Sequence, residues 1–260
     1  MESEYQKKLQ IFTKAMAKYK PDVIALQEIM QPIEANNSDY PCINAGKIPL
    51  KEGNHALNIV KELDNLGLKY NFVWLGFKRS YESFDEGLVI MTPHKIINID
   101  IVTMSPFDKY DNWKTRKALG VLINGQWFYS IHMGWWDDPV SPLQDELKRL
   151  QRAVESKEKL WLMGDFNSVA EERGKGYDMV ASLGLYDTYN LAVNKDEGIT
   201  AYTDIDGWGE KKEPKGVRID YIFSSIKENV ESSFTIFNGR NEERVSDHFG
   251  IIVTTGREDI

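Results

Sequence analysis

The 260-residue sequence contains a single cysteine, Cys42, so no disulfide can form within the chain. A chain without disulfides is typical of a reducing compartment, and we therefore expect a cytoplasmic location. We recognise no signal peptide, and no apolar run approaches the about 20 residues that a membrane-spanning helix needs. Internal repeats and low-complexity segments are also missing. The sequence thus argues against disulfide-stapled, fibrous and membrane-spanning proteins.

Positive charge is scarce as well. The chain has 32 Lys and Arg residues against 40 Asp and Glu, a net charge of −8. A broad surface for long nucleic acid needs clustered Lys and Arg, so this balance argues against one, although a local basic patch is still compatible with it. With 42% hydrophobic residues, the chain can bury a substantial core, and we predict a single domain over residues 1–260.

The most informative stretch is residues 159–167, KLWLMGDFN. Residues 160–163 form a short apolar run that predicts a strand covered on both faces, and Gly164 lets the backbone turn after it. Asp165 and Asn167 are two residues apart, so in an extended chain they project to the same side. A carboxylate beside an amide suits a divalent cation, a water to be activated or a phosphate oxygen. A polar turn is the simpler alternative.

Helical and strand patterns alternate along the rest of the chain and indicate an α/β protein. We predict helices at 5–19, 54–66, 141–154 and 177–183, and strands at 22–27, 69–75, 87–92, 95–103, 118–123, 126–131, 160–163, 218–223 and 251–254. Asn54 is the expected N-cap of the second helix. Ser141 is the expected N-cap of the third, because Pro142 and Gln144 follow at positions typical of a helix start.

Polar side chains stand at the ends of many of these strands. They are Glu28, Glu86, His132, Asp165, Asn167, Asp220, Asp247 and His248. Carboxylates brought together repel unless a cation lies among them, so the set predicts a divalent metal site. Because no Cys–His cluster has zinc spacing, Mg²⁺ or Mn²⁺ is the expected ion. Two histidines near such an ion could bind a phosphate or move protons.

Two tryptophans, Trp135 and Trp136, follow His132 in a loop. They could stack on a sugar or a base, or pack over the edge of a sheet, and the sequence leaves both readings open. Residues 204–217 contain Trp208 among several glycines and a proline. A loop of this length and composition is typical of a lid or a substrate-binding loop.

Four motifs, in this order, resemble the endonuclease/exonuclease/phosphatase superfamily, also called deoxyribonuclease I-like. They are LQE ending at Glu28, GDFN containing Asp165 and Asn167, RIDYIF around Asp220, and SDHFG at Asp247 and His248. The resemblance covers nearly the whole chain. It implies a four-layer αββα sandwich of two mixed sheets and divalent-metal-dependent hydrolysis of a phosphate ester.

The resemblance also implies roles around the metal. Glu28 would bind the ion, and Asp247 would help to hold or position it. Asp165 would orient or deprotonate the attacking water, and Asn167 would hold a phosphate oxygen. The chemistry would be in-line attack by water on phosphorus.

Further roles are implied for the histidines. His248 would pair with Asp220, which would give that aspartate the partner it needs inside an apolar strand. His132 would contact the phosphate from the other side, held by Glu86. Arg116 is a further candidate for phosphate contact.

One departure from the family pattern concerns the start. The family usually opens with a strand ending in an Asn that supports the metal site, whereas this chain starts at the first helix, so that strand and that Asn have no counterpart. Either Met1 is an internal methionine of a longer protein or a core strand is missing. A missing central strand would expose apolar surface and unpaired backbone.

The substrate expectation comes from three segments, 112–117, 132–136 and 204–208, which are most similar to bacterial maltose 6′-phosphate phosphatases and their relatives. This implies a phosphomonoesterase for a small sugar phosphate, with Trp135, Trp136 or Trp208 facing the sugar. A nuclease or other phosphodiesterase using the same residues is the alternative. A non-catalytic binding domain is a third hypothesis, against which the full set of acid, amide and histidine residues speaks.

Overall fold

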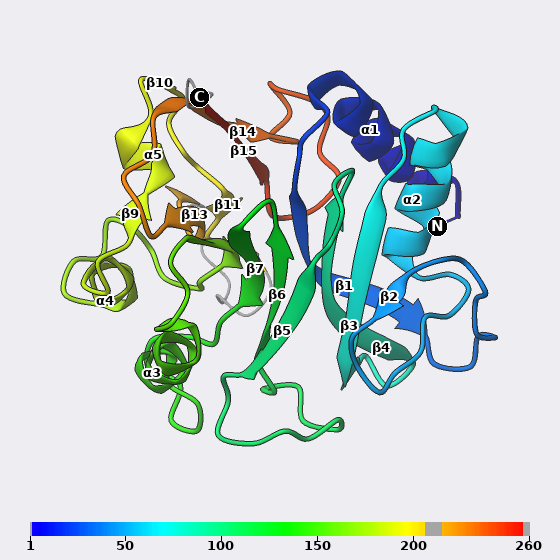
Figure 1. The fold of residues 1–260 in the computed structure, drawn as a ribbon, viewed down its shortest axis with the longest axis horizontal. Coiled ribbons are helices and arrows are strands. Elements are labelled where there is room, and N and C mark those ends of the chain that lie inside the picture. The colour runs from blue at the N-terminus through cyan, green and yellow to red at the C-terminus, as the bar shows by residue number, and fades with distance from the viewer. Residues whose placement is uncertain (1, 206–214, 257–260) are drawn as a thin grey trace.

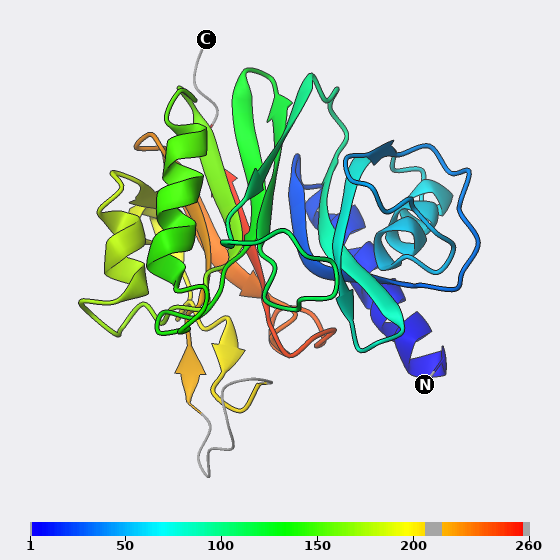
Figure 2. The ribbon, with the colours of Figure 1, turned by 90° about the horizontal axis from the view of Figure 1, so that it is seen from below.

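The predicted four-layer αββα sandwich is confirmed in the computed structural model, which describes residues 2–205 and 215–256. Two β layers pack against each other (Figure 2). Helices α1 (Glu2–Tyr19) and α2 (His55–Asn65) cover one outer face, and α3 (Leu143–Val154) and α4 (Gly176–Ala181) cover the other. In the described part of the chain, no helix combines the length and apolarity needed to cross a membrane.

One β layer is a six-stranded sheet in the order β5-β6-β7-β8-β13-β9. Its strands are β5 (Asn98–Thr103), β6 (Lys117–Ile123), β7 (Gln126–His132), β8 (Leu160–Asp165), β13 (Asp220–Ser224) and β9 (Tyr186–Asp187). A hairpin turn at Asn124-Gly125 joins β6 to β7, and both residues have positive φ, as a tight turn of this type requires. Neighbours run antiparallel except β7 and β8, which are parallel.

The second β layer consists of two separate sheets (Figure 1). One has the order β1-β4-β3-β2 and contains β1 (Ile24–Pro32), β4 (Phe84–Thr92), β3 (Asn71–Ser80) and β2 (Ile43–Asn44). The other has the order β10-β14-β15 and contains β10 (Asn194–Lys195), β14 (Val230–Ile236) and β15 (Gly250–Thr255). A small hairpin of β11 (Ala201–Tyr202) and β12 (Gly216–Val217), together with helix α5 (Thr188–Leu191), completes the described elements.

The two sheets of this layer face each other through unpaired edges. Residues 24–27 of β1 and 250–252 of β15 line a mostly apolar cavity of about 160 Å³, which α1 covers with Phe12 and Met16. Among the described residues, no strand lies between β1 and β15.

Apolar side chains fill all three spaces between the layers. Val73, Leu88 and Leu119 belong to the buried cluster between the two β layers. A second cluster joins α1 and α2 to the four-stranded sheet, and a third joins α3 and α4 to the six-stranded sheet. Burial on both faces makes each sheet a rigid platform for the polar residues at its strand ends.

Of the two predicted helix N-caps, the structure confirms one and contradicts the other. Asn54 is the N-cap of α2, and its side chain accepts hydrogen bonds from the amides of Ala56 and Leu57. The prediction for Ser141 was wrong, because α3 begins one residue later with Pro142 at the N-cap. The Ser141 hydroxyl donates instead to the buried Glu146 carboxylate, at 2.6 Å.

Candidate active site

Three adjacent strands place His132, Asp165 and Asp220 side by side. In the sheet register, His132 on β7 lies opposite Asp165 on β8, and Asp165 lies opposite Asp220 on β13. Directly opposed residues in a sheet project from the same face, and neighbouring strands are about 4.8 Å apart. His132 Nε2 accordingly lies 3.6 Å from Asp165 Oδ2. A row of three functional groups thus follows from strand pairing alone.

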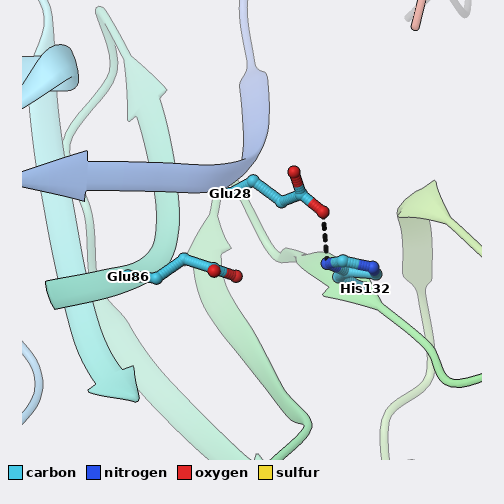
Figure 3. A group of neighbouring side chains, drawn as sticks. All are labelled: Glu28, Glu86 and His132. Atoms are coloured by element: carbon cyan, nitrogen blue, oxygen red, sulfur yellow. Dashed lines mark ion pairs between the residues drawn. The ribbon is translucent and has the colours of Figure 1, made fainter. Parts of the chain in front are cut away.

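The other β layer contributes Glu28 from β1, and Asp247 and His248 from the turn before β15. A bulge interrupts the pairing of β1 at Glu28, whose φ of 52° lies in the left-handed region. A bulge re-aims the side chain it carries, and Glu28 Oε1 lies 3.5 Å from His132 Nδ1 (Figure 3). One cavity of about 390 Å³ is lined by six of the predicted residues: Glu28, His132, Asp165, Asp220, Asp247 and His248.

The two predicted histidines that line this cavity, His132 and His248, have opposite electrostatic surroundings. His248 Nδ1 lies 3.0 Å from Asp220 Oδ2, so the predicted pairing is present. Burial opposes protonation of His248, but the Asp220 carboxylate outweighs it and raises the histidine pKa to about 10. Burial, together with the positive charges of Arg116 and Lys78, holds the pKa of His132 well below its usual value. At neutral pH, His248 is therefore an imidazolium and His132 a neutral imidazole.

Asp165 is the most enclosed carboxylate in the row. Its pKa is raised, first by burial and then by the neighbouring Asp220 charge. The backbone N–H of Asn167 donates to Asp165 Oδ1 at 2.7 Å, and Asn167 Nδ2 donates to the Met133 carbonyl at 2.9 Å. Asn167 has a φ of 47°, a conformation that Asn tolerates better than most residues. The first bond orients the Asp165 carboxylate. The second holds the Asn167 side chain and leaves its other Nδ2 hydrogen for a ligand.

Two groups of side chains are close enough to hold a metal ion. Glu28, Glu86 and His132 form one, and Asp165, Asp220 and His248 form the other, each with ligand atoms within 4.8 Å of one another. Figure 3 shows Glu86 reaching from β4 toward the Glu28–His132 pair. Reduced contact with water and repulsion by Glu86 raise the pKa of Glu28. A cation beside Glu28 would relieve this repulsion, and oxygen ligands suit Mg²⁺ or Mn²⁺.

Lys78 is a residue of this region that sequence reasoning missed. Its Nζ lies 2.8 Å from Glu86 Oε1, with only 5% and 8% of the two side chains exposed. Burial and the nearby charge of Arg116 lower the Lys78 pKa. The β3–β4 register brings Lys78 opposite Glu86, so counting residues across that hairpin could have found it. Lys78 is thus the ion-pair partner of Glu86, and support of His132 by Glu86 stays a prediction.

Arg116 lies immediately before β6, and the whole residue is only 5% exposed. Its charge contributes to the electrostatic surroundings of Glu28 and His132. Its guanidinium makes no hydrogen bond or ion pair with the residues that the structure describes. A buried guanidinium in this position is suited to an anionic ligand.

The two predicted tryptophans border a second pocket of about 330 Å³, which is also lined by Asn167, two residues after Asp165. Trp135 and Trp136 are both half-buried, and Trp113 packs edge-on against Trp135 at a centroid distance of 5.9 Å. Trp208 lies outside the described residues, so its predicted role has no structural test here. The tryptophan loop therefore lies close to Asn167, and its contact with a substrate stays a prediction.

Glu146 of α3 anchors this loop and was also missed. It is fully buried and accepts hydrogen bonds from the Gly134 amide, at 2.7 Å, and from the Ser141 hydroxyl. Sequence patterning suggests a solvated face for the charged residues of this helix. Only the tertiary contact with the loop reveals why this glutamate is buried.

Replacing Glu146 by Ala should lower the free energy of unfolding by about 2 to 4 kcal/mol, because two buried donors lose their acceptor. Urea unfolding followed by tryptophan fluorescence measures the change. Glu146→Gln should recover part of the loss, and Glu155→Ala, at an exposed position just after α3, should change stability by less than about 0.5 kcal/mol. Equal stabilities for Glu146→Ala and Glu155→Ala would contradict the anchoring role.

The comparison with known families agrees with this geometry. The family model described as "Endonuclease/Exonuclease/phosphatase family" matches residues 3–248. The chain is a member of the endonuclease/exonuclease/phosphatase family. This family comprises metal-dependent phosphoesterases with phosphatase and nuclease members, so the protein is a phosphoric ester hydrolase. The acidic and histidine clusters described above could hold a divalent ion.

Solved structures of the endonuclease/exonuclease/phosphatase family show the same fold. A family protein from Leptotrichia buccalis is 31% identical, with a TM-score of 0.85 over 97% of this chain and 94% of that chain. A mannosyl-6-phosphatase from Bacteroides thetaiotaomicron is 15% identical, with a TM-score of 0.64 over 97% and 92%. A 3′ phosphatase from Neisseria, bound to a product DNA hairpin, is 17% identical, with a TM-score of 0.61 over 96% and 95%. No curated protein matches the sequence.

Proposed function

We propose that this protein is an Mg²⁺- or Mn²⁺-dependent phosphatase that hydrolyses a small phosphate monoester, with a sugar phosphate such as maltose 6′-phosphate as the leading substrate class. The observation that carries this proposal is the convergence of six polar side chains from both β layers on one cavity. We further infer that residues 1–260 act as a single catalytic domain. A cytoplasmic location stays a prediction from the cysteine content.

The proposed chemistry begins with water held against Asp165. Asp165 lies between His132 and Asp220, where it is placed to accept a proton from the attacking water, and a cation bound nearby would favour its ionised form. Asn167 would hold a phosphate oxygen through its remaining Nδ2 hydrogen. The divalent ion that Glu28 and Asp247 would hold supplies Lewis-acid stabilisation of the phosphate when bound.

The remaining residues would meet the negative charge that develops on the phosphoryl group. His248, kept charged by Asp220, can donate a hydrogen bond to a phosphate oxygen, and neutral His132 can donate from one ring nitrogen. Arg116 adds a fixed positive charge nearby, and Lys78 keeps Glu86 paired beside the site. Preformed donors of this kind need no rearrangement at the moment of reaction.

Two observations support a small sugar phosphate over nucleic acid. The net charge of −8 provides little attraction for a long polyanion. The paired tryptophans beside Asn167 offer flat surfaces for a sugar ring. A structural neighbour named as a mannosyl-6-phosphatase adds support at the level of fold. The alternative is a nuclease with the same residues, which the DNA-bound 3′ phosphatase neighbour favours at the same level.

A phosphate-release screen over hexose 6-phosphates, maltose 6′-phosphate, nucleotides and DNA tests the proposal. We expect Mg²⁺-dependent release from sugar phosphates, at least about 10²-fold above the rate in EDTA, because the carboxylate cluster needs its cation. Adding Mg²⁺ back to the EDTA-treated protein should restore the rate. Salt-sensitive DNA cleavage without phosphate release from any sugar phosphate would favour the nuclease instead.

A further inference from the structure

The pocket beside Asn167 differs in chemistry from the metal cleft. Its volume is about 330 Å³, within the range of small-molecule sites. The loop after β7 contributes Trp135, Trp136 and Asp137 to its lining, and the segment after β8 contributes the rest. Trp136 also packs against the buried cluster beneath α3, which limits its freedom to move. The aromatic part of the lining is therefore held in place.

The charged part of the lining is acidic overall. It consists of Asp137 from the tryptophan loop and Glu172 and Lys175 from the segment after β8, and all three are exposed. Lys175 Nζ lies 2.8 Å from Glu172 Oε2, an ion pair that neutralises one of the two carboxylates. The hydrogen bond to Glu172, and to a smaller extent the charge of Asp137, raise the Lys175 pKa. Carboxylate oxygens facing a pocket accept hydrogen bonds well and repel anions.

We propose that this pocket binds the leaving group of the substrate, and that the leaving group is an uncharged, hydroxyl-rich sugar ring. Trp135 and Trp136 stack against the ring, and Asp137 and Glu172 accept hydrogen bonds from its hydroxyls. The assignment rests on the proposed phosphatase function, since Asn167 joins the pocket to the reacting phosphate. It makes these four side chains the determinants of sugar specificity.

The same pocket disfavours substrates that carry a second phosphate. A nucleotide diphosphate, or a DNA strand continuing past the cleaved bond, would bring an anion beside Asp137 and Glu172. Like charges at contact distance repel unless a cation lies between them, and Lys175 is already ion-paired with Glu172. The acidic part of the lining thus selects a monophosphate on a neutral body.

Steady-state kinetics of three variants test this assignment against two substrates. The sugar probe is whichever of maltose 6′-phosphate and the hexose 6-phosphates the wild type hydrolyses fastest, and the ring-free probe is glycerol 3-phosphate. Trp136→Ala and Asp137→Asn should each raise KM for the sugar probe about tenfold. Both should leave kcat/KM for glycerol 3-phosphate within about twofold. Trp127→Ala, a half-buried tryptophan that lies outside the pocket, should alter neither.

Asp137 is exposed, so Asp137→Asn gives an answer even if Trp136→Ala fails to fold. Equal changes for both probes, or no change for the sugar probe, would overturn the pocket assignment and leave the phosphatase proposal standing. Release from glycerol 3-phosphate but from no sugar phosphate would also overturn it alone. Cleavage of DNA only, with no monoester hydrolysed, would overturn the phosphatase proposal itself.

Discussion

Asp165→Asn should lower kcat by about 10²- to 10⁴-fold, the usual range for removal of a general base. The reason is geometric, since Asp165 lies between His132 and Asp220 in the same row and its carboxylate is the enclosed one. An amide fits the same space and can still accept the hydrogen bond from the Asn167 amide. It cannot take a proton from water at neutral pH. The measurement is kcat for phosphate release at saturating Mg²⁺.

The stability of Asp165→Asn shows whether a loss of kcat comes from the chemistry or from unfolding. The folded-state pKa of Asp165 is raised, so ionisation of this group costs stability once the pH exceeds the ordinary pKa of an aspartate. Asparagine carries no such cost, and the thermal midpoint at neutral pH should stay equal or rise. Asp111→Asn, which removes an exposed partner of Arg79, is the matched control and should keep full activity. Unchanged kcat in Asp165→Asn would remove Asp165 from the proposed chemistry, whereas no hydrolysis by either protein would support a binding domain without catalysis.

Asp220→Asn should shift the alkaline limb of the pH–rate profile to lower pH. In the native protein, Asp220 raises the His248 pKa to about 10, so the imidazolium persists through neutral and mildly alkaline pH. Without that carboxylate, burial acts against the charged form. We expect about a 10²-fold loss of kcat/KM near pH 8 and a smaller loss near pH 6. Rates measured across this range, with proton NMR titration of His248, test the shift.

The Asp220–His248 pair also affects the stability of the folded protein, and the direction of its pH dependence follows from the raised His248 pKa. Because the folded-state pKa of His248 is raised, its contribution is fully present below the ordinary histidine pKa and is lost as the pH rises through the folded value of about 10. Asp22→Asn is the matched control, since Asp22 pairs with His94 at 2.6 Å on the surface and should leave the pH–rate profile unchanged. An identical alkaline limb in the Asp220→Asn variant and the wild type would remove His248 from the proposed chemistry.

The site residues at strand ends were the easiest ones to predict from the sequence. Asp165, His132 and Asp220 each follow or begin a run of apolar residues, and a polar group at such a position has few structural explanations. The prediction that they meet is confirmed, because neighbouring strands set their spacing. The four-layer architecture was likewise predictable from the alternation of helical and strand patterns together with the family motifs.

Lys78 and Glu146 could not be found in this way. Each is a charged residue buried by a contact distant in sequence or across a hairpin, and local patterning assigns such residues to solvent. Ser141 shows the reverse error. Its sequence context matches a helix N-cap, but its hydroxyl donates to the buried Glu146 carboxylate instead. The bulge at Glu28 depends on how β1 pairs with β4, which the sequence of β1 alone does not specify.

The proposed reacting groups lie in register on the paired strands β7, β8 and β13, whereas the proposed sugar contacts lie on loops. The spacing of His132, Asp165 and Asp220 is a property of the backbone ladder, so it survives any change in the connecting loops that leaves the sheet intact. The tryptophan loop and the segment after β8 carry no ladder constraint and can diverge freely. Descendants of one such scaffold can therefore exchange a sugar for a nucleic acid without rebuilding the machinery that breaks the bond.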